Sequence, residues 1–568
     1  MRKITGRLLL LVGLIVALTG GLTFGVTHGL STPHAVAAGA QMRAAAPTDT
    51  FTATATATVT STATATATAT ATVTPTATIT PTATIAPTTT VTPTVVPPTS
   101  TSTPTPGSPT TDYFAEGYTG LAATNGRATF TEVLNILNPS QNNPATVTIT
   151  YYLQGSATPV TVTRTINAKT TLRESVNTDV GNDKIVAAVV KSAQRVYATR
   201  TMTRVSPTGQ RLDGSATLPV PAPATSWGFP EGYTGVTFQE YLTVLNPSAT
   251  QANVHILLAP QAATDAGAHT LNFTVPALSR VTENIRALNQ GTGAQSVGMI
   301  ITSDQPIVPE RVLYFGNGAG SGKFGSTVSR GINTPSTTLS LAYGSSGGAT
   351  STASGLNSVG NQAFITLLNS SLTAASTVAV SFYNVAGQQL GQTVSKTLAP
   401  GTRQTVIANT VLGTSAVSVF SVRLNATSPI EAEEAQYFNG SPNIGDHPGV
   451  DYPGQFSATT HAFLSDLATK SADGANVNRD IYLYNPGAVA ISVAATYFGT
   501  SGNTDTATYS VPAGGVFDVD VDSDTQTSIP PGAVGAELTA SSGSFIAFGL
   551  GLTNDGLSAL EDVGVPAY

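Results

Sequence analysis

Internal duplication is the feature that most constrains the fold of this chain. The block YFAEGYTG at 113–120 recurs as WGFPEGYTG at 227–235, and each block leads into a strand-like run that ends at an Asn turn. Two fainter copies of the turn follow. The four Asn residues, separated by 108, 123 and 116 residues, are Asn138, Asn246, Asn369 and Asn485. A period of this size predicts repeated domain-sized units.

The second half of each unit repeats as well. PIVPERVLYF at 306–315 parallels PIEAEEAQYF at 429–438. We therefore expect four repeats that fill the chain from residue 112 to its last residue. Their predicted bounds are 112–225, 226–338, 339–459 and 460–568.

The local sequence pattern within each repeat is typical of β-strands. Segments such as Ala145 to Leu153 and Ala488 to Phe498 are rich in Val, Ile, Thr and Tyr and alternate in polarity. Turn signals separate them, and no convincing amphipathic helix occurs. About seven short strands in roughly 110 residues are typical of an immunoglobulin-like sandwich, so the fold class predicted is all-β, with four tandem immunoglobulin-like antiparallel β-sandwich domains.

The Asn turn has a structural explanation. Asn can cap its own turn, and a following Pro fixes φ and cannot extend a β-ladder, so the strand must end there. Leu137-Asn138-Pro139-Ser140 and Leu245-Asn246-Pro247-Ser248 show the pattern most clearly. We interpret the turn as a structural feature and not as a binding motif.

These motifs carry a resemblance to a known kind of protein. The YFAEGYTG opening, the LNPS turn and the PIVPERVLYF segment together resemble bacterial secreted or surface proteins with tandem immunoglobulin-like β-sandwich repeats, a family of largely unassigned function. The resemblance is good over 113–335 and weak beyond. It implies a surface or secreted array, and it supplies no catalytic residues.

The N-terminal region predicts export. Arg2, Lys3 and Arg7 precede an uncharged run from Leu8 to Val26, and Ala35-Val36-Ala37 fits a signal peptidase site. Residues 1–37 are thus a signal peptide cleaved before residue 38, or a retained signal anchor, since 19 apolar residues nearly span a bilayer. Either outcome predicts a secreted or membrane-anchored extracellular protein that meets the membrane only through this segment.

A Thr-rich segment without a core follows the signal. Residues 38–111 are predicted to form a disordered Thr/Ala/Pro-rich stalk, because Thr and Ala bury too little apolar surface to offset the ordering entropy. Residues 50–111 carry no charge. Extended at about 3.1 Å per residue, they would reach on the order of 190 Å.

Composition excludes several classes of function. Lys and Arg number 24 against 31 Asp and Glu, which argues against a nucleic-acid partner because no basic face can form. The chain has no Cys, so disulfides, thiolate nucleophiles and cysteine zinc sites are impossible. We expect no cofactor. Cell-envelope glycans or surface proteins are the expected partners.

Carboxylates are the only candidates for a metal or catalytic site. Asp518, Asp520, Asp522 and Asp524 form the densest cluster and could attract Ca²⁺, although acids two apart on a strand more often mark its solvent face. Glu310 is adjacent to Arg311, with which we expect an ion pair. Glu116 and Glu231 are duplicated in the opening motif. For them we expect packing between neighbouring repeats, with ligand binding as the alternative.

Three functions compete on these grounds. The first is a non-enzymatic surface or secreted repeat protein, structural or adhesive, displayed on the stalk. The second is a carbohydrate-binding protein of the cell envelope, in which aromatic side chains stack on sugar rings. Its candidate rings are Trp227, Tyr233, Tyr151 and Tyr482. The third is a secreted hydrolase, which has no recognisable catalytic residues beyond Glu116, Glu231 and Glu310.

Overall fold

The computed structural model describes most of the chain after residue 108. The described ranges are 109–120, 129–206, 211–235, 238–261, 270–288, 296–315, 325–347, 361–413, 419–438, 449–455, 457–470, 474, 476–525, 529, 534–553, 559–563 and 565–566. The predicted signal segment, and the predicted stalk up to residue 108, lie outside them. The first strand begins at Thr110, so the last two residues assigned to the stalk belong to the folded part. None of the helices in the described ranges has the length and apolar character needed to cross a bilayer.

The described chain is all-β, and its strands form four similar sheet pairs within one compact unit, Val96–Tyr568. Sheet pair 1 has two four-stranded antiparallel sheets, ordered β1-β6-β3-β4 and β5-β2-β7-β8. Its strands are β1 (Thr110–Phe114), β2 (Thr129–Asn138), β3 (Ala145–Leu153), β4 (Val160–Ile166), β5 (Thr170–Ser175), β6 (Val186–Ser192), β7 (Tyr197–Val205) and β8 (Arg211–Thr217).

Sheet pairs 2 and 3 repeat this order, except that one long strand replaces the sixth and seventh strands. The first half of that strand pairs in one sheet and the second half in the other, which joins each pair into a seven-stranded sheet. Sheet pair 2 contains β9 (Ala224–Phe229), β10 (Phe238–Asn246), β11 (Ala252–Pro260), β12 (Thr270–Val275), β13 (Ser279–Asn284), β14 (Val297–Phe315) and β15 (Gly325–Arg330). Sheet pair 3 contains β16 (Ser336–Leu341), β17 (Gln362–Leu368), β18 (Ser376–Asn384), β19 (Gln389–Leu398), β20 (Arg403–Ile407), β21 (Phe420–Tyr437) and β22 (Gly449–Pro453).

Sheet pair 4 returns to separate sixth and seventh strands. It contains β23 (His461–Leu464), β24 (Val477–Tyr484), β25 (Ile491–Gly499), β26 (Thr504–Val511), β27 (Val516–Asp520), β28 (Val534–Ala540), β29 (Ile546–Thr553), β30 (Ala559–Val563) and β31 (Val565–Pro566). Helices in the described ranges are single turns that follow the fifth strands: α1 (Val176–Val180), α2 (Ile285–Leu288), α3 (Ala408–Leu412) and α4 (Val521–Thr525).

The strand order differs from the predicted immunoglobulin order. In an immunoglobulin domain the first strand joins the sheet of the second, and the seventh pairs with the sixth. Here the first strand pairs with the sixth and the seventh with the second, as β1–β6 and β2–β7 show. Periodicity predicted the bounds of β3, Ala145–Leu153, whereas β25 begins at Ile491, three residues after the predicted Ala488. Periodicity could not determine which sheet the first and seventh strands would join.

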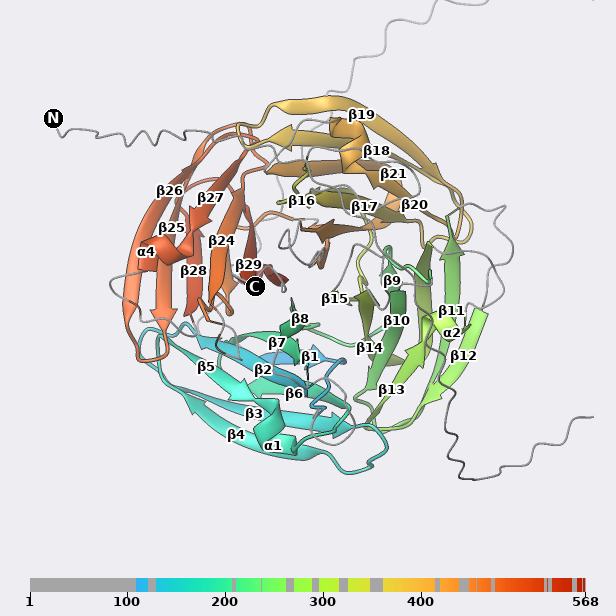
Figure 1. Ribbon diagram of the computed structural model, residues 1–568, viewed down its shortest axis with the longest axis vertical. Coiled ribbons are helices and arrows are strands. Elements are labelled where there is room, and N and C mark those ends of the chain that lie inside the picture. The colour runs from blue at the N-terminus through green and yellow to red at the C-terminus, as the bar shows by residue number, and fades with distance from the viewer. Residues whose placement is uncertain are drawn as a thin grey trace, which may run out of the picture. The chain divides into compact units, whose positions relative to one another are not determined.

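The four sheet pairs have a propeller-like arrangement. The eighth strands contact one another in cyclic order: β8 contacts β15, β15 contacts β22, β22 contacts β30, and β30 contacts β8. The fourth strands are edge strands with few buried side chains, and Figure 1 shows β4, β12, β19 and β26 on the outside, with β8 and β15 near the centre. Contact between the last and first sheet pairs closes the cycle.

The predicted capping of the Asn turn is confirmed, and the same Asn side chain also joins two loops. The side-chain carbonyl of Asn138 accepts the Ser140 N–H at 3.1 Å, as expected of a turn cap. Its amide nitrogen donates to the carbonyl oxygens of Asn143, Ile166 and Asn167 at 3.0 to 3.1 Å, which ties the end of β2 to the end of β4. The equivalent bonds recur at Asn246, Asn369 and Asn485.

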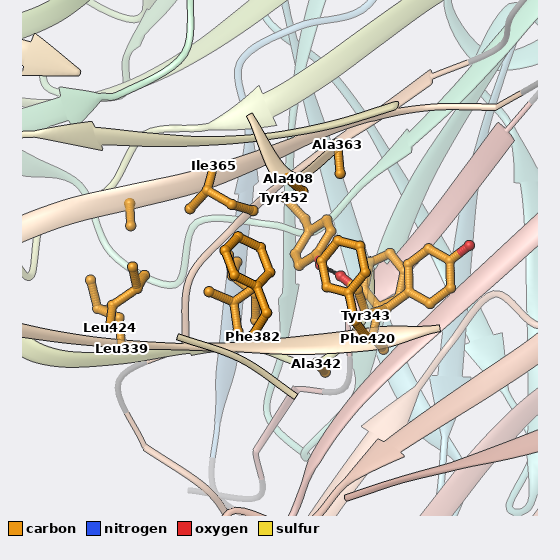
Figure 2. Packing of buried hydrophobic residues seen from close by; sticks show 14 of the residues in the cluster. Leu339, Ala342, Tyr343, Ala363, Ile365, Phe382, Ala408, Phe420, Leu424 and Tyr452 are labelled. Carbon is orange, nitrogen blue, oxygen red and sulfur yellow. Dashed lines mark hydrogen bonds between the residues drawn. The ribbon is translucent and has the colours of Figure 1, made fainter. Parts of the chain in front are cut away.

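Several hydrophobic clusters span neighbouring sheet pairs, although sheet pairs 1 and 4 each also contain a cluster of their own. The largest cluster combines residues of sheet pair 3, such as Phe382 and Phe420, with Tyr482 and Phe548 of sheet pair 4. Figure 2 shows the part of it around Phe382, Phe420, Tyr343 and Tyr452. Burial at these joints contributes roughly 1.5–3 kcal/mol for each large apolar side chain, so the pairs depend on one another.

Candidate functional site

The joint between sheet pairs 1 and 2 is a buried network of charged side chains. Nη1 of Arg200, on β7, donates to Glu310 Oε2 of β14 at 2.8 Å and also to the main-chain oxygen of Glu116. The Glu116 N–H donates to the same Glu310 carboxylate at 2.6 Å. Arg280, on β13, lies 3.3 Å from Glu116 Oε2. Arg200 and Glu310 are completely buried, so each needs the other to offset its desolvation.

The joint between sheet pairs 2 and 3 repeats this network. Arg311 Nη2 lies 3.0 Å from Glu433 Oε1, the Glu231 N–H donates to Glu433 Oε2 at 3.1 Å, and Arg403 lies 3.1 Å from Glu231 Oε2. Arg311 also contacts Asp451 at 2.7 Å. The residues correspond one to one as Glu116 and Glu231, Arg280 and Arg403, Arg200 and Arg311, and Glu310 and Glu433.

The predicted ion pair between Glu310 and Arg311 is wrong. Successive residues on a strand point to opposite faces of the sheet, so these two side chains serve different joints. Glu310 binds Arg200 of sheet pair 1, and Arg311 binds Glu433 and Asp451 of sheet pair 3. The alternation of β14 was visible in the sequence. The partners were not, because Arg200 and Glu310 are 110 residues apart.

A second buried carboxyl lies behind each network. Burial raises the pKa of Glu132 to about 8, and the neighbouring Arg200 only partly opposes the shift. Glu240 occupies the same place in the next joint, and burial likewise raises its pKa to about 8. Gly117 of the opening motif makes room for Glu132, because a Cβ there would lie 2.6 Å from Glu132 Oε1 and 2.6 Å from the Val186 oxygen.

The other two joints have different contacts at the same places. Between sheet pairs 3 and 4, Tyr343 stacks on Phe548 with a centroid distance of 5.6 Å. Between sheet pairs 4 and 1, the Ser465 hydroxyl lies 2.6 Å from that of Thr199, and the Thr201 hydroxyl donates to Asp466 at 2.5 Å. The strand register makes Phe548 the counterpart of Glu310 in sheet pair 4.

A cleft opens beside the ionic network of the first joint. It has a volume of about 430 Å³, and Glu116 and Arg280 lie in its wall. Four aromatic side chains in the lining form two edge-to-face pairs, Tyr118 with Phe130 at 4.9 Å and Tyr241 with Tyr314 at 6.2 Å. The remaining lining residues are Gly117, Ile185, Arg204, Gln239, Thr282 and Val312. We call this cleft 1.

The second ionic joint has an equivalent cleft of about 390 Å³, which we call cleft 2. Its aromatic pairs are Tyr233 with Phe238 at 4.8 Å and Phe364 with Tyr437 at 5.8 Å, again edge to face. Glu231 and Arg403 take the places of Glu116 and Arg280. The remaining lining residues are Gln261, Ser296, Thr405 and Ile407.

Most of the aromatic residues predicted to stack on sugars are buried. Trp227 is 2% exposed, lies in the core of sheet pair 2 and donates its indole N–H to the Ala224 oxygen. Tyr151 is buried in the core of sheet pair 1, and Tyr482 is buried in the cluster shared by sheet pairs 3 and 4. Tyr233 lies in cleft 2. Its equivalent Tyr118, in the other copy of the same motif, was missed, although the duplication could have identified it.

The acidic cluster follows the prediction only in part. Asp518 and Asp520 share an exposed face of β27, but the strand ends there, and α4 places Asp522 in a half-buried position. The side chain of Asp524 lies outside the described residues. No group of three acidic or His side chains in the described ranges is arranged to hold a metal ion.

The architecture and joints define a class: an all-β chain of four sheet pairs in a propeller-like cycle, with charged networks at two of the joints. Neither a family model nor a curated protein matches the chain. A crystal structure titled Thermotoga maritima 1070 is 15% identical, with a TM-score of 0.18, over 19% of this chain and 94% of that one. A tetra-tandem repeat from the extending region of a large adhesion protein is 13% identical, with a TM-score of 0.09, over 81% of this chain and 100% of that one. At these scores neither likeness carries an argument about function.

Proposed function

We propose that the chain is a non-enzymatic extracellular repeat protein, secreted or anchored by its N-terminal segment, with an adhesive or structural role. In this proposal the four sheet pairs are duplicated units of the tandem-repeat surface proteins that the sequence resembles. The Thr/Pro-rich segment displays them beyond the cell envelope.

The observation that carries this proposal is that the three candidate catalytic acids form ion pairs across the joints. Glu310 is completely buried against Arg200, and the Glu116 and Glu231 carboxylates contact Arg280 and Arg403 across the joints. A general acid must reach substrate with a proton to donate, but Glu310 is completely buried, and the Glu116 and Glu231 carboxylates are each paired with a guanidinium. A closed cycle with buried joints also suits a protein exposed to proteases, because local opening must break several contacts at once.

The test is a deletion in the producing cell. Residues 112–568 are removed while the N-terminal segment is kept, and cell attachment and envelope integrity are measured, with the full chain restored as the control. We expect a loss of one of the two properties. If both are unchanged, the adhesive and structural roles are refuted. Protease treatment of intact cells, followed by detection of the chain, tests its exposure at the surface.

A further inference from the structure

We propose that clefts 1 and 2 are two copies of one binding site for a neutral pyranose ring, so that a single chain holds two sugar residues of a glycan. This inference rests on the adhesive function proposed above and specifies its ligand. The clefts share the ion pair and the four aromatic positions, although other lining residues differ.

Half-buried aromatic rings give each cleft stacking surfaces for a sugar. In cleft 2 these are Tyr233 and Phe364, since Phe238 and Tyr437 are buried. A pyranose has apolar C–H faces and a rim of hydroxyls, so it fits between aromatic walls that have polar groups at their margin. In cleft 1, Tyr118 and Phe130 come from sheet pair 1, and Tyr241 and Tyr314 come from sheet pair 2. The rings therefore line the cleft from both sides of the joint. Its volume of about 430 Å³ lies within the range of small-molecule sites.

The charges favour a neutral ligand. Glu116 and Arg280 face cleft 1 as an ion pair, and Glu231 and Arg403 do the same in cleft 2 at 3.1 Å, so each wall offers a carboxylate and a guanidinium without net charge. The carboxylate of each pair can accept from a sugar hydroxyl, and charge-assisted hydrogen bonds are the stronger kind. The guanidiniums of Arg280 and Arg403, each 1% exposed, balance its charge. Arg204, the other charged lining residue of cleft 1, forms an ion pair with Asp213.

The opening motif is built to place the tyrosine. The Tyr118 ring packs so closely over Gly120 that any side chain at position 120 would collide with it, and Tyr233 covers Gly235 in the same way. Glu116 forms the charged wall, two residues earlier. EGYTG therefore supplies both an aromatic and a polar group to each cleft, which explains why the full motif occurs at these two joints. The corresponding segments of sheet pairs 3 and 4 lack it.

Two equivalent sites on one compact unit would favour a polymer over a monosaccharide. Once one ring of a glycan is bound, the second site meets the same chain at a high effective concentration. Weak single sites are then sufficient for adhesion.

The test uses calorimetric titration of the full chain with four neutral hexasaccharides: cellohexaose, maltohexaose, mannohexaose and N-acetylchitohexaose. Hexagalacturonate and choline serve as the anionic and cationic probes. The variants are Tyr118→Ala, Tyr233→Ala and their combination. Tyr383→Ala, a half-buried tyrosine of β18 outside both clefts, is the matched control. Thermal unfolding of each variant is recorded alongside.

We expect at least one neutral hexasaccharide to bind, and each single substitution to weaken binding. The combined variant should bind at least about ten-fold more weakly, a change of about 1.4 kcal/mol, while Tyr383→Ala is unchanged. The inference is overturned if no neutral hexasaccharide binds at millimolar concentration, if only hexagalacturonate or choline binds, or if the combined variant binds normally. If the full chain binds no neutral hexasaccharide but still supports cell attachment, the sugar sites are rejected and the adhesive function is retained.

Discussion

The buried carboxyls at the joints should make the protein lose stability as the pH rises through neutrality. Burial raises the pKa of Glu132 and of Glu240 from 4.5 to about 8. Between these values the folded chain keeps both protons, and the unfolded chain has released them. The folded state therefore binds more protons, so the free energy of unfolding falls as the pH increases. The stabilisation is fully present below about pH 4.5 and is lost as the pH rises through about 8.

The size of this pH dependence follows from the one proton that each glutamate keeps in the folded state and releases on unfolding. Each glutamate lowers the free energy of unfolding by about 1.4 kcal/mol per pH unit between roughly pH 5.5 and 7.5. Together they remove about 5 kcal/mol over that window. Asp112 and Glu431 add to the wild-type slope, because burial raises the pKa of each to about 7.

The assay is urea unfolding at several pH values, followed by the fluorescence of Trp227. This residue is the one tryptophan of the chain, and its burial in sheet pair 2 makes its emission report on unfolding next to both ionic joints. Glu132→Gln and Glu240→Gln should each flatten the pH slope by about one proton. Asp304→Asn is the control, because hydrogen bonds from Asn253 lower the pKa of exposed Asp304 and place its titration below the window.

The wild-type slope and the variants test different parts of the reasoning. A free energy of unfolding that stays constant or rises from pH 5.5 to 7.5 would refute the assignment of protonated carboxyls at the joints. A normal wild-type slope that neither glutamine variant changes would assign the effect to other groups, and the argument for Glu132 and Glu240 would fail.

Two further substitutions test the turn and the ionic joint. Asn138→Ala removes three hydrogen bonds to main-chain oxygens and should lower the free energy of unfolding in urea by about 2–4 kcal/mol. The control, Asn142→Ala at an exposed position, should lower it by less than about 0.5 kcal/mol. Equal losses would contradict the role given to the buried amide of Asn138. Glu310→Ala leaves Arg200 buried without its carboxylate and should cost about 3–5 kcal/mol. Adding Arg200→Met should recover part of that loss, whereas strictly additive losses would show that the pair does not interact.

The sequence predicted local structure well, because local structure depends on neighbouring residues. Alternation fixed the bounds of β3, and Asn138 was recognised as a turn cap. Its bonds to Ile166 and Asn167 were missed, since they join loops that are distant in the sequence. The joints were missed for the same reason. Burial of Arg200 and Glu310 can be inferred only when the packing of one repeat on the next is known.

The candidate site was only partly accessible from sequence. Glu231 was named because EGYTG is duplicated, and Tyr233 was named as a ring that could stack on a sugar. The cleft they line also needs Phe364 and Arg403 from the next sheet pair. Aromatic residues such as Trp227 and Tyr482 look identical to these in composition, and burial alone separates them. A residue that stacks on a ligand therefore cannot be identified until the packing of neighbouring sheet pairs is known.

The different chemistry of the joints determines the order of the sheet pairs. In sheet pair 3 the strand register places Glu434 where sheet pairs 1 and 2 carry Arg200 and Arg311. If sheet pair 3 packed on a face that presents Glu310, two buried carboxylates would meet without the guanidinium that stabilises either of them. Its actual partner presents Phe548, which stacks on Tyr343, while the Tyr452 hydroxyl donates to Glu434 at 2.9 Å.

Head-to-tail contacts between similar units can extend without limit if any unit accepts any other. A mismatched joint here would bury an unpaired charge, which typically costs about 3–5 kcal/mol. That cost disfavours exchange between chains at the ionic joints. The last sheet pair closes on the first through hydrogen bonds of Thr199 to Ser465 and of Thr201 to Asp466, contacts that differ from those of the ionic joints.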